Sequence, residues 1–232
     1  MNDRISVIIP SRNRLKLLTN RALLALFFQK YEPYEIIVVD DGSDIPYSVN
    51  EWLEERVKLI RIEKVYSYPP ENKKAEWLSG PAIALNKALE HVTGNWIYRC
   101  DDDDWLFSDC LMELLKFAKK GNFDFVSALW RKEDGTIGMP YESGTVIPEL
   151  GVPLGGVQTW LCRAEYKEVK YNPYSWKKKW NANNELDWLE RVVEKFAPKV
   201  GFLPKVVCEI DPRPGLEEIG LKAYLKEHGG KK

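Results

Sequence analysis

The stretch Glu35-Ile-Ile-Val-Val-Asp-Asp-Gly-Ser43 decides the fold class of this chain. Its four consecutive β-branched residues predict a buried strand, and the four residues after them form a turn sequence. Similar strand-like runs occur at 5–10, 57–62, 96–100 and 123–129. Segments with helical character lie between the runs, at about 14–29, 49–56, 79–91 and 108–119. Strands that alternate with helices predict an α/β fold with a mostly parallel central sheet and helices on both faces.

The second half of the chain is less regular. Glu133-Asp-Gly-Thr136 is typical of a hairpin turn, and recurring glycines and prolines over 138–156 predict loops and short strands. Further elements are predicted as a helix over 183–196, a strand over 200–210 and a last helix over 216–226. No internal repeat and no long polar linker is found, so we predict a single domain over residues 1–232.

Composition excludes several classes of protein. A chain of 232 residues is long enough to bury a core without disulfides, and its net charge of -1 gives no global indication of a nucleic-acid partner. The four cysteines form no CxxC pair and no signal peptide is recognised, so we expect reduced thiols and a cytoplasmic location. No run approaches the roughly 20 apolar residues of a membrane span, so any membrane contact is expected to be peripheral.

Polar clusters follow three of the predicted strands. They are Ser11-Arg-Asn-Arg14, Asp40-Asp41 and Asp101-Asp-Asp-Asp104. Ligands of open parallel sheets bind beyond the carboxyl ends of the strands, so we expect these clusters to converge on one edge. Four consecutive aspartates repel one another unless water or a cation offsets their charge. Carboxylate oxygens suit Mg²⁺ or Mn²⁺, and a plain solvated acidic loop is the alternative.

Four segments resemble the family-2 glycosyltransferases of the GT-A fold. They are Val7-Ile-Ile-Pro-Ser-Arg-Asn-Arg14, the stretch 35–43 quoted above, Gly80-Pro-Ala-Ile-Ala-Leu-Asn86 and Gly94-Asn-Trp-Ile-Tyr-Arg-Cys-Asp-Asp-Asp-Asp-Trp105, which carries that family's DXD motif. The resemblance covers about the first 130 residues well and the remainder loosely. It implies an inverting transfer from a UDP- or TDP-linked sugar that uses Mn²⁺ or Mg²⁺. Residues 1–130 would hold the nucleotide sugar, and residues 131–232 would form the acceptor-side half and the tail.

The resemblance implies a role for each matched residue. Asp41 would accept from the ring N–H of the nucleotide base, Asp101 would lie near the ribose, and Asp103 would bind the metal. The other residues implied on the nucleotide-sugar side are Pro10, Ser11, Arg12, Asn86 and Asp102. One departure is Leu85, where the family often has a basic residue. Its missing charge is expected from Lys73, Lys74 or Arg99.

The acceptor side is implied by two later segments. Asn184-Glu-Leu-Asp-Trp-Leu-Glu-Arg191 resembles the family's acidic motif at a helix start, where the catalytic base lies. Aligned by Arg191, Glu185 takes the position of that base, so we favour it, with Asp187 as the second choice. Positions i and i+2 of a helix face different ways, so we expect only one of the two to point into the site. The alternative is that both acids only stabilise the helix N-terminus. Gly155, Gly156 and Trp160 resemble the acceptor-side segment, with a turn and core packing as the alternatives.

These residues are consistent with three functions. The first is glycosyl transfer from a nucleotide-sugar donor to a glycan, a lipid-linked acceptor or a protein. The second is a catalytically silent sugar-nucleotide or glycan-binding module, suggested by Glu185 where the family normally has Asp. The third, a nucleotidyltransferase, ranks last because the chain has no glycine-rich loop after the first strand. We expect no nucleic-acid partner, and the sequence leaves the oligomeric state open.

Overall fold

The computed structural model describes residues 3–48 and 56–210. The predicted helix over 216–226 lies outside the described residues, as does that over 49–56 apart from Arg56. The strands are β1 (Ile5–Ser11), β2 (Glu35–Asp41), β3 (Val57–Ile62), β4 (Trp96–Arg99), β5 (Asp104–Leu106), β6 (Phe125–Lys132), β7 (Leu161–Arg163) and β8 (Val200–Ile210). The α-helices are α1 (Leu15–Leu17), α2 (Leu24–Phe27), α4 (Lys73–Ser79), α5 (Ala82–Leu89), α6 (Cys110–Gly121) and α7 (Asn184–Phe196). The shorter helical pieces are η1 (Leu18–Leu23), η2 (Pro148–Leu150), η3 (Val157–Thr159), η4 (Ala164–Glu168) and η5 (Ser175–Lys177).

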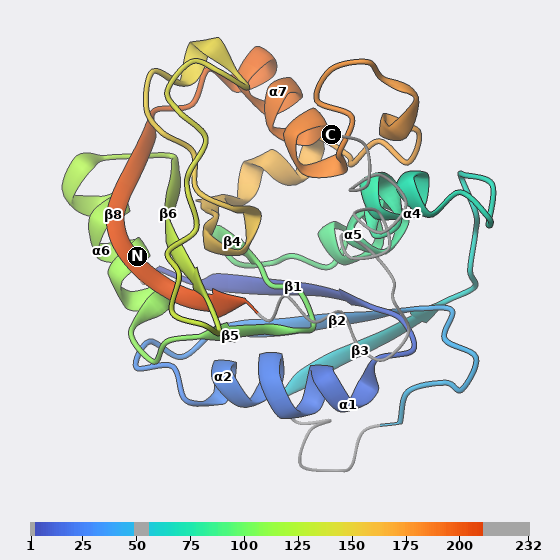
Figure 1. The fold of residues 1–232 in the computed structure, drawn as a ribbon. Coiled ribbons are helices and arrows are strands. Elements are labelled where there is room, and N and C mark those ends of the chain that lie inside the picture. The colour runs from blue at the N-terminus through green and yellow to red at the C-terminus, as the bar shows by residue number, and fades with distance from the viewer. Residues whose placement is uncertain (1–2, 49–55, 211–232) are drawn as a thin grey trace.

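One eight-stranded sheet takes strands from both halves of the chain, in the order β3-β2-β1-β4-β7-β6-β8-β5. The pairs β3–β2, β2–β1, β1–β4 and β6–β8 are parallel. The pairs β4–β7, β6–β7 and β5–β8 are antiparallel. The prediction of a mostly parallel sheet is therefore confirmed. Because β1, β2 and β4 are parallel neighbours, their carboxyl ends lie at one edge, on the side where β1 to β3 end in Figure 1.

Helices cover both faces of the sheet, as predicted (Figure 1). Side chains of β1 alternate between two cores, as the period of a strand requires. Val7 and Ile9 pack in the core that contains Leu18 and Leu26 of the helical segment below the sheet. Ile8 packs in the core that contains Leu85 of α5 on the other face. All six side chains are buried, and each contributes about 1.5–3 kcal/mol by leaving water.

Two predicted helices differ in detail from the observed ones. The helix predicted over 14–29 is formed, but its middle, η1, is a π-helical segment between α1 and α2. The helix predicted over 79–91 is preceded by a separate helix, α4, because Pro81 has no N–H to donate and caps the start of α5. The Asn72 side chain caps α4 by accepting from the Ala75 N–H at 3.0 Å.

The four cysteines, Cys100, Cys110, Cys162 and Cys208, are all buried and none forms a disulfide. Burial raises the pKa of each thiol above its ordinary value. They act as small apolar side chains, as expected. Within residues 3–48 and 56–210, none of the helices combines the length and the apolar character that crossing a bilayer requires.

Candidate active site

The loop of aspartates after β4 meets the end of β1 through direct contacts. Ser11, the last residue of β1, donates from Oγ to Asp102 Oδ2 at 2.7 Å. Arg14, three residues later, pairs with Asp102 Oδ1 at 2.8 Å and with Asp103 Oδ2 at 2.5 Å. The predicted convergence of these two strand ends is present in the structure. Arg14 fixes the shape of the aspartate loop because one guanidinium bonds two neighbouring carboxylates.

Negative charge exceeds positive charge in this loop. Burial raises the pKa of Asp102 to about 7, although Arg14 opposes the change. Burial also raises the pKa of Asp103 and that of Asp104, whose carboxylate accepts from the Asp101 N–H at 2.8 Å. A further cation near the loop would offset repulsion among these carboxylates.

The donor set of the loop fits a divalent cation that also binds a ligand. Among the described residues, no group of three or more acidic, cysteine or histidine side chains is arranged to hold a metal alone. Mg²⁺ and Mn²⁺ do not need such a cage, because one or two carboxylates and the phosphates of a substrate complete their coordination. Asp101 and Asp103 are the partly exposed carboxylates of the loop, so they are the residues that would hold the ion.

Asp41 at the end of β2 forms a second polar centre at the same sheet edge. Its carboxylate is buried and pairs with Lys64 just beyond β3. Burial raises the pKa of Asp41 despite Lys64 and the nearby Arg12. Asp41 Oδ1 accepts no hydrogen bond, although a buried acceptor without a partner costs about 1–3 kcal/mol. This oxygen therefore lacks the donor that the N–H of a ligand would supply.

The surroundings of Asp41 suit a flat, polar ligand. Arg12 donates from Nη2 to Tyr66 Oη at 2.8 Å and lies over its ring. Lys64 Nζ lies 5.5 Å from the centre of the Tyr66 ring and 5.9 Å from that of the Tyr68 ring. Pro10 lies two residues before Arg12, in β1, and pairs with Val39 of β2. Asp40, by contrast, accepts from the backbone of the following turn and so stabilises the loop itself.

Arg99 of β4 connects the aspartate loop to the second half of the chain. Only 5% of its side chain is exposed. Arg99 Nη2 donates to Asp101 Oδ1 and to Glu185 Oε1, both at 3.2 Å, and Nη1 donates to Asn184 Oδ1 at 3.3 Å. Two carboxylates 84 positions apart in the sequence therefore share one buried guanidinium. This contact places Glu185 at the aspartate loop.

Asp187 belongs to a different network. Its carboxylate accepts from Lys178 Nζ at 2.9 Å and from Arg191 Nη2 at 2.6 Å. Glu185 instead faces Arg99, and burial raises its pKa even though Arg99 opposes the change. The cap of α7 is the Asn183 side chain, which accepts from the Leu186 N–H at 3.1 Å. The two acids therefore point toward different partners, as their spacing predicts.

The remaining predicted site residues have packing contacts in the structure. Asn86 uses its amide to bond the Tyr171 backbone twice, at 2.8 and 2.7 Å, and so ties α5 to the second half. A Cβ at Gly155 would lie 1.9 Å from the Ala128 carbonyl oxygen, so close packing requires glycine there. Trp160 is buried and donates from Nε1 to the Gly155 carbonyl at 2.8 Å. Gly156 comes directly after Gly155 and is the N-cap residue of η3. An acceptor-side role for Gly155, Gly156 and Trp160 stays a prediction.

Sequence reasoning missed Lys64, and it left the source of the basic charge open. Lys64 lies two residues after β3, so the rule that site residues follow strand ends would have found it. Leu85 is fully buried in the core on the face of the sheet that Ile97 also faces. Arg99 lies two residues after Ile97 on the same face of β4, and it pairs with Asp101 of the aspartate loop. Lys73 instead pairs with Glu76 at 3.0 Å.

Comparisons with known proteins show the family of this chain. The sequence model of glycosyl transferase family 2 matches residues 6–143, more than half of the 232 residues. An uncharacterized glycosyltransferase of Rickettsia bellii (strain RML369-C) is 32% identical over 153 residues, which are 63% of this chain and 20% of that protein. A GalNAc(5)-diNAcBac-PP-undecaprenol beta-1,3-glucosyltransferase of Campylobacter jejuni is 31% identical over 122 residues, 51% of this chain and 35% of that protein. The chain thus spans only part of the length of these relatives.

Solved structures share the fold at low sequence identity. Residues 1–349 of S. aureus TarS in complex with UDP-GlcNAc align with a TM-score of 0.62 at 17% identity, over 91% of this chain and 59% of that chain. The mannosyltransferase PcManGT of Pyrobaculum calidifontis, in complex with GDP-Man and Mn²⁺, aligns with a TM-score of 0.65 at 20% identity, over 90% and 57%. These likenesses show a common GT-A fold. From the family match together with this fold, we conclude that the chain belongs to glycosyl transferase family 2.

Proposed function

We propose that this chain moves a sugar from a UDP- or TDP-linked donor to an acceptor hydroxyl with inversion at the sugar carbon. The observation that carries the proposal is the contact of Arg99 with both Asp101 and Glu185. It joins the donor-side carboxylates of the first 130 residues to an acidic residue of the acceptor-side half. A base and a leaving-group site must lie close together for a single displacement.

On the donor side, Asp41 is the partner for the ring N–H of the base, because its Oδ1 is buried and accepts no other hydrogen bond. Pro10, Ser11 and Arg12 line the same strand end. The TarS structure with UDP-GlcNAc supports a uridine diphosphate donor by analogy only. Asp103, with Asp101, would hold Mn²⁺ or Mg²⁺, and the bound ion would offset the negative charge of the diphosphate.

On the acceptor side, Glu185 is the base. The proton of the acceptor hydroxyl passes to its carboxylate while the hydroxyl oxygen forms a bond to the sugar carbon and the bond to the diphosphate oxygen breaks. Burial raises the pKa of Glu185, which makes its carboxylate a stronger base than an exposed one. Arg99 orients the carboxylate by donating to Oε1.

The acceptor is a glycan, a lipid-linked acceptor or a protein, bound by the half that follows residue 130. The name of the Campylobacter relative contains an undecaprenol-linked acceptor, which supports the lipid-linked class by analogy. The four unpaired, buried cysteines support a cytoplasmic location, where thiols stay reduced.

Two matched variants test the assignment of the base. Glu185→Gln keeps the hydrogen bond from Arg99 but cannot take a proton, so we expect transfer to fall about 10²–10⁴-fold while donor binding persists. Asp187→Asn breaks the ion pairs with Lys178 and Arg191, so it should lower stability and leave transfer measurable. Transfer is measured by release of the nucleoside diphosphate with an acceptor panel, and donor binding by calorimetry.

The opposite pattern, with transfer lost only in Asp187→Asn, would make Asp187 the base. Donor binding without turnover in the wild-type protein against every acceptor would instead favour the catalytically silent binding module.

A further inference from the structure

The segment between η4 and α7 is basic and rich in aromatic residues. Residues 170–183 contain four lysines and no acidic residue. Lys178 pairs with Asp187 and Glu190 of α7. Lys177 and Lys179 are exposed, and Lys177 Nζ lies 5.1 Å from the centre of the Tyr174 ring. We call residues 170–183 the aromatic–basic segment.

Two aromatic side chains of this segment face solvent. Trp180 is 59% exposed and Tyr174 is 53% exposed. Trp180 is the one exposed tryptophan within residues 3–48 and 56–210, since the others there are buried or half-buried. Burying a large exposed ring is favourable, so a partner that covers Trp180 would bind more tightly because of that burial.

The aromatic–basic segment is held firmly against the body of the protein. Trp176 donates from Nε1 to the Ser67 carbonyl at 3.0 Å. Asn181 donates from Nδ2 to the Val146 carbonyl at 2.9 Å. The exposed rings therefore project from an anchored base rather than from a loose loop.

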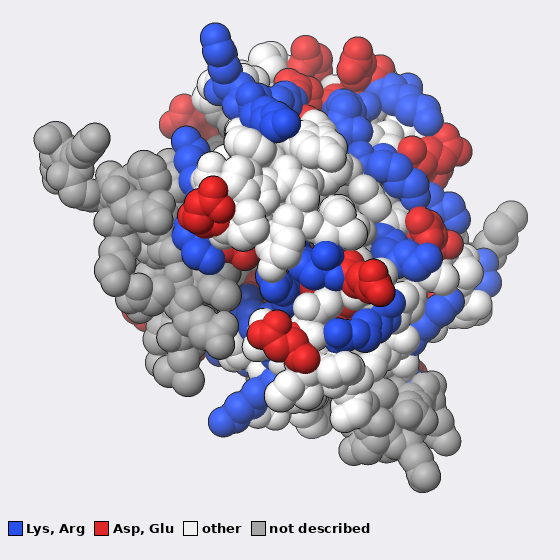
Figure 2. Space-filling view, turned by 90° about the vertical axis from the view of Figure 1, so that its right-hand side faces the viewer, with Lys and Arg blue, Asp and Glu red and all other residues white. Residues whose placement is uncertain are grey.

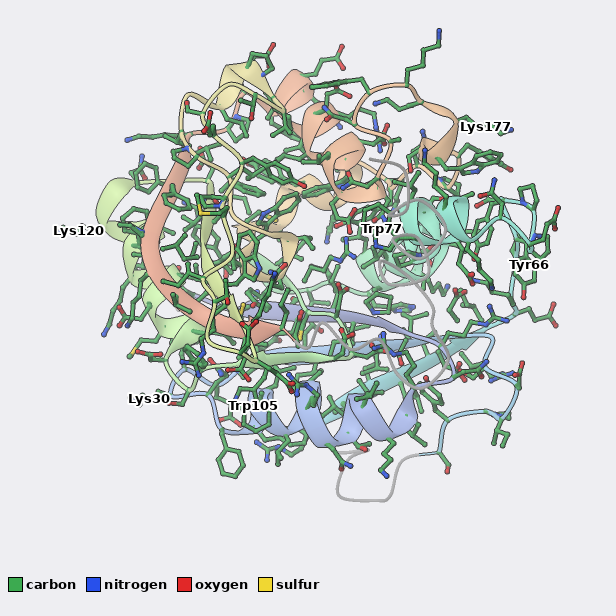
Figure 3. All side chains as sticks on the ribbon, viewed as in Figure 1. Lys30, Tyr66, Trp77, Trp105, Lys120 and Lys177 are labelled. Atoms are coloured by element: carbon green, nitrogen blue, oxygen red, sulfur yellow. The ribbon has the colours of Figure 1, made fainter. Side chains whose placement is uncertain are left out.

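The segment lies beside the proposed site. It ends at Asn183, the cap of α7, so Trp180 precedes Glu185 by five residues. Its contact with Ser67 brings it next to Tyr66, which lies over Arg12 near Asp41. Figure 3 shows Lys177 and Tyr66 along one edge of the molecule, and Figure 2 shows Lys and Arg side chains, with several Asp and Glu among them, around an uncharged area on that face.

We propose that the aromatic–basic segment docks on an anionic lipid bilayer. Tyrosine and tryptophan prefer the boundary between headgroups and acyl chains, because one part of the ring is apolar and the other donates a hydrogen bond. Lys177 and Lys179 add attraction to anionic headgroups, and Trp180 enters the boundary between them and the acyl chains. Docking would hold the site near a lipid-linked acceptor, and in this respect the inference rests on the proposed function.

Vesicle sedimentation tests the proposal without any transferase activity. The protein is mixed with vesicles of phosphatidylglycerol and phosphatidylcholine, and with vesicles of phosphatidylcholine alone. We expect binding to the anionic vesicles that weakens as salt rises. Lys177→Glu/Lys179→Glu should lower the partition coefficient at least about 30-fold, because each lysine near an anionic surface contributes roughly fivefold and the glutamates add repulsion. Trp180→Ala should lower it on the order of tenfold.

The controls place the same changes on other surfaces. Lys116→Glu/Lys120→Glu makes the same charge change on α6, and Figure 3 shows Lys120 on the side opposite Lys177. Phe28→Ala removes a ring that is 68% exposed at the end of α2. Both control variants should bind vesicles as the wild type does. All four variants should keep the wild-type melting temperature, since the altered side chains are exposed.

Three results would overturn the proposal. The first is a wild type that anionic vesicles do not carry down at low salt, and the second is a loss of binding in the control variants as large as that in the test variants. Binding to dextran sulfate, but not to vesicles, would assign the surface to an anionic glycan instead. Vesicle binding that follows the predicted pattern in a protein without transfer activity would refute the proposed function alone.

Discussion

Replacing Arg99 by Met tests whether one buried guanidinium holds the two halves of the site together. Methionine keeps much of the side-chain volume but removes every hydrogen bond to Asp101, Asn184 and Glu185. Glu185 then stays in a largely buried position without a counter-ion. The fold of the sheet should persist, because β4 keeps its backbone pairing with β1 and β7.

The expected loss follows from burial. Breaking a buried ion pair by removing one partner costs about 3–5 kcal/mol. Asp101 is 36% exposed, so water screens part of its share and the lower end applies. We expect Arg99→Met to lower the free energy of unfolding by about 3 kcal/mol near pH 8, which is about 6–12 °C in melting temperature for a chain of this size.

The loss should depend on pH. Burial already raises the pKa of Glu185, and Arg99 offsets part of that effect. Without Arg99 the pKa of Glu185 in the folded protein rises further. The full loss in the free energy of unfolding is therefore present above that raised pKa. It disappears as the pH falls toward the ordinary glutamate value of about 4.3, because a protonated Glu185 needs no counter-ion. The difference in stability between the wild type and Arg99→Met should therefore be largest at about pH 8 and smallest near pH 4.5.

Chemical denaturation at a series of pH values, without divalent cations, measures this difference. Arg131→Met is the matched control, since its pair with Glu209 at 2.9 Å lies at the surface and should cost less than about 1 kcal/mol. A loss for Arg99→Met that stays the same at every pH would mean that packing alone is affected. A loss no larger than that of the control would refute the bridging role.

Two further predictions concern the frame around the site. Gly155→Ala places a Cβ 1.9 Å from a backbone oxygen, so it should lower the free energy of unfolding by about 3 kcal/mol or more. In Gly156→Ala the Cβ meets the Gln158 side chain instead, so the loss should be smaller. Denaturant unfolding of the two variants compares these losses. Glu35 accepts from Ser6 and from the backbone N–H of Thr93 and Gly94, and although burial alone would raise its pKa, these hydrogen bonds lower it. Glu35→Gln should therefore lower the free energy of unfolding by about 1 kcal/mol near pH 7. This loss should vanish as the pH falls through the lowered pKa of Glu35. An equal loss at about pH 3 would contradict this direction of the pH dependence.

The strands that the sequence predicted are those with a pattern long enough to recognise. Residues 36–39 are buried on both faces of the sheet, so every position is apolar and β-branched, and β2 was predicted from them. β5 and β7 have three residues each and no such pattern. Each of them pairs with strands from distant parts of the chain. The sequence pattern of a three-residue segment does not specify such partners.

The gathering of polar groups could be predicted, but their individual partners could not. Parallel strands bring their carboxyl ends to one edge whatever the side chains are, so the meeting of Ser11 with Asp102 followed from topology. The partners of Arg14 and Arg99 depend on side-chain directions that only the packed structure sets. The separate partners of Glu185 and Asp187 likewise depend on where Arg99, Lys178 and Arg191 lie around α7.

Calorimetry of UDP binding tests the central claim, that the aspartate loop holds a nucleoside diphosphate together with a divalent cation. UDP is titrated into the wild type, Asp103→Asn and the exposed control Asp134→Asn, with Mn²⁺ and with a chelator. We expect Mn²⁺ to strengthen UDP binding at least tenfold, or about 1.4 kcal/mol, in the wild type and the control, but not in Asp103→Asn. Equal affinity with and without Mn²⁺ in the wild type, or an unchanged response in Asp103→Asn, would contradict the claim.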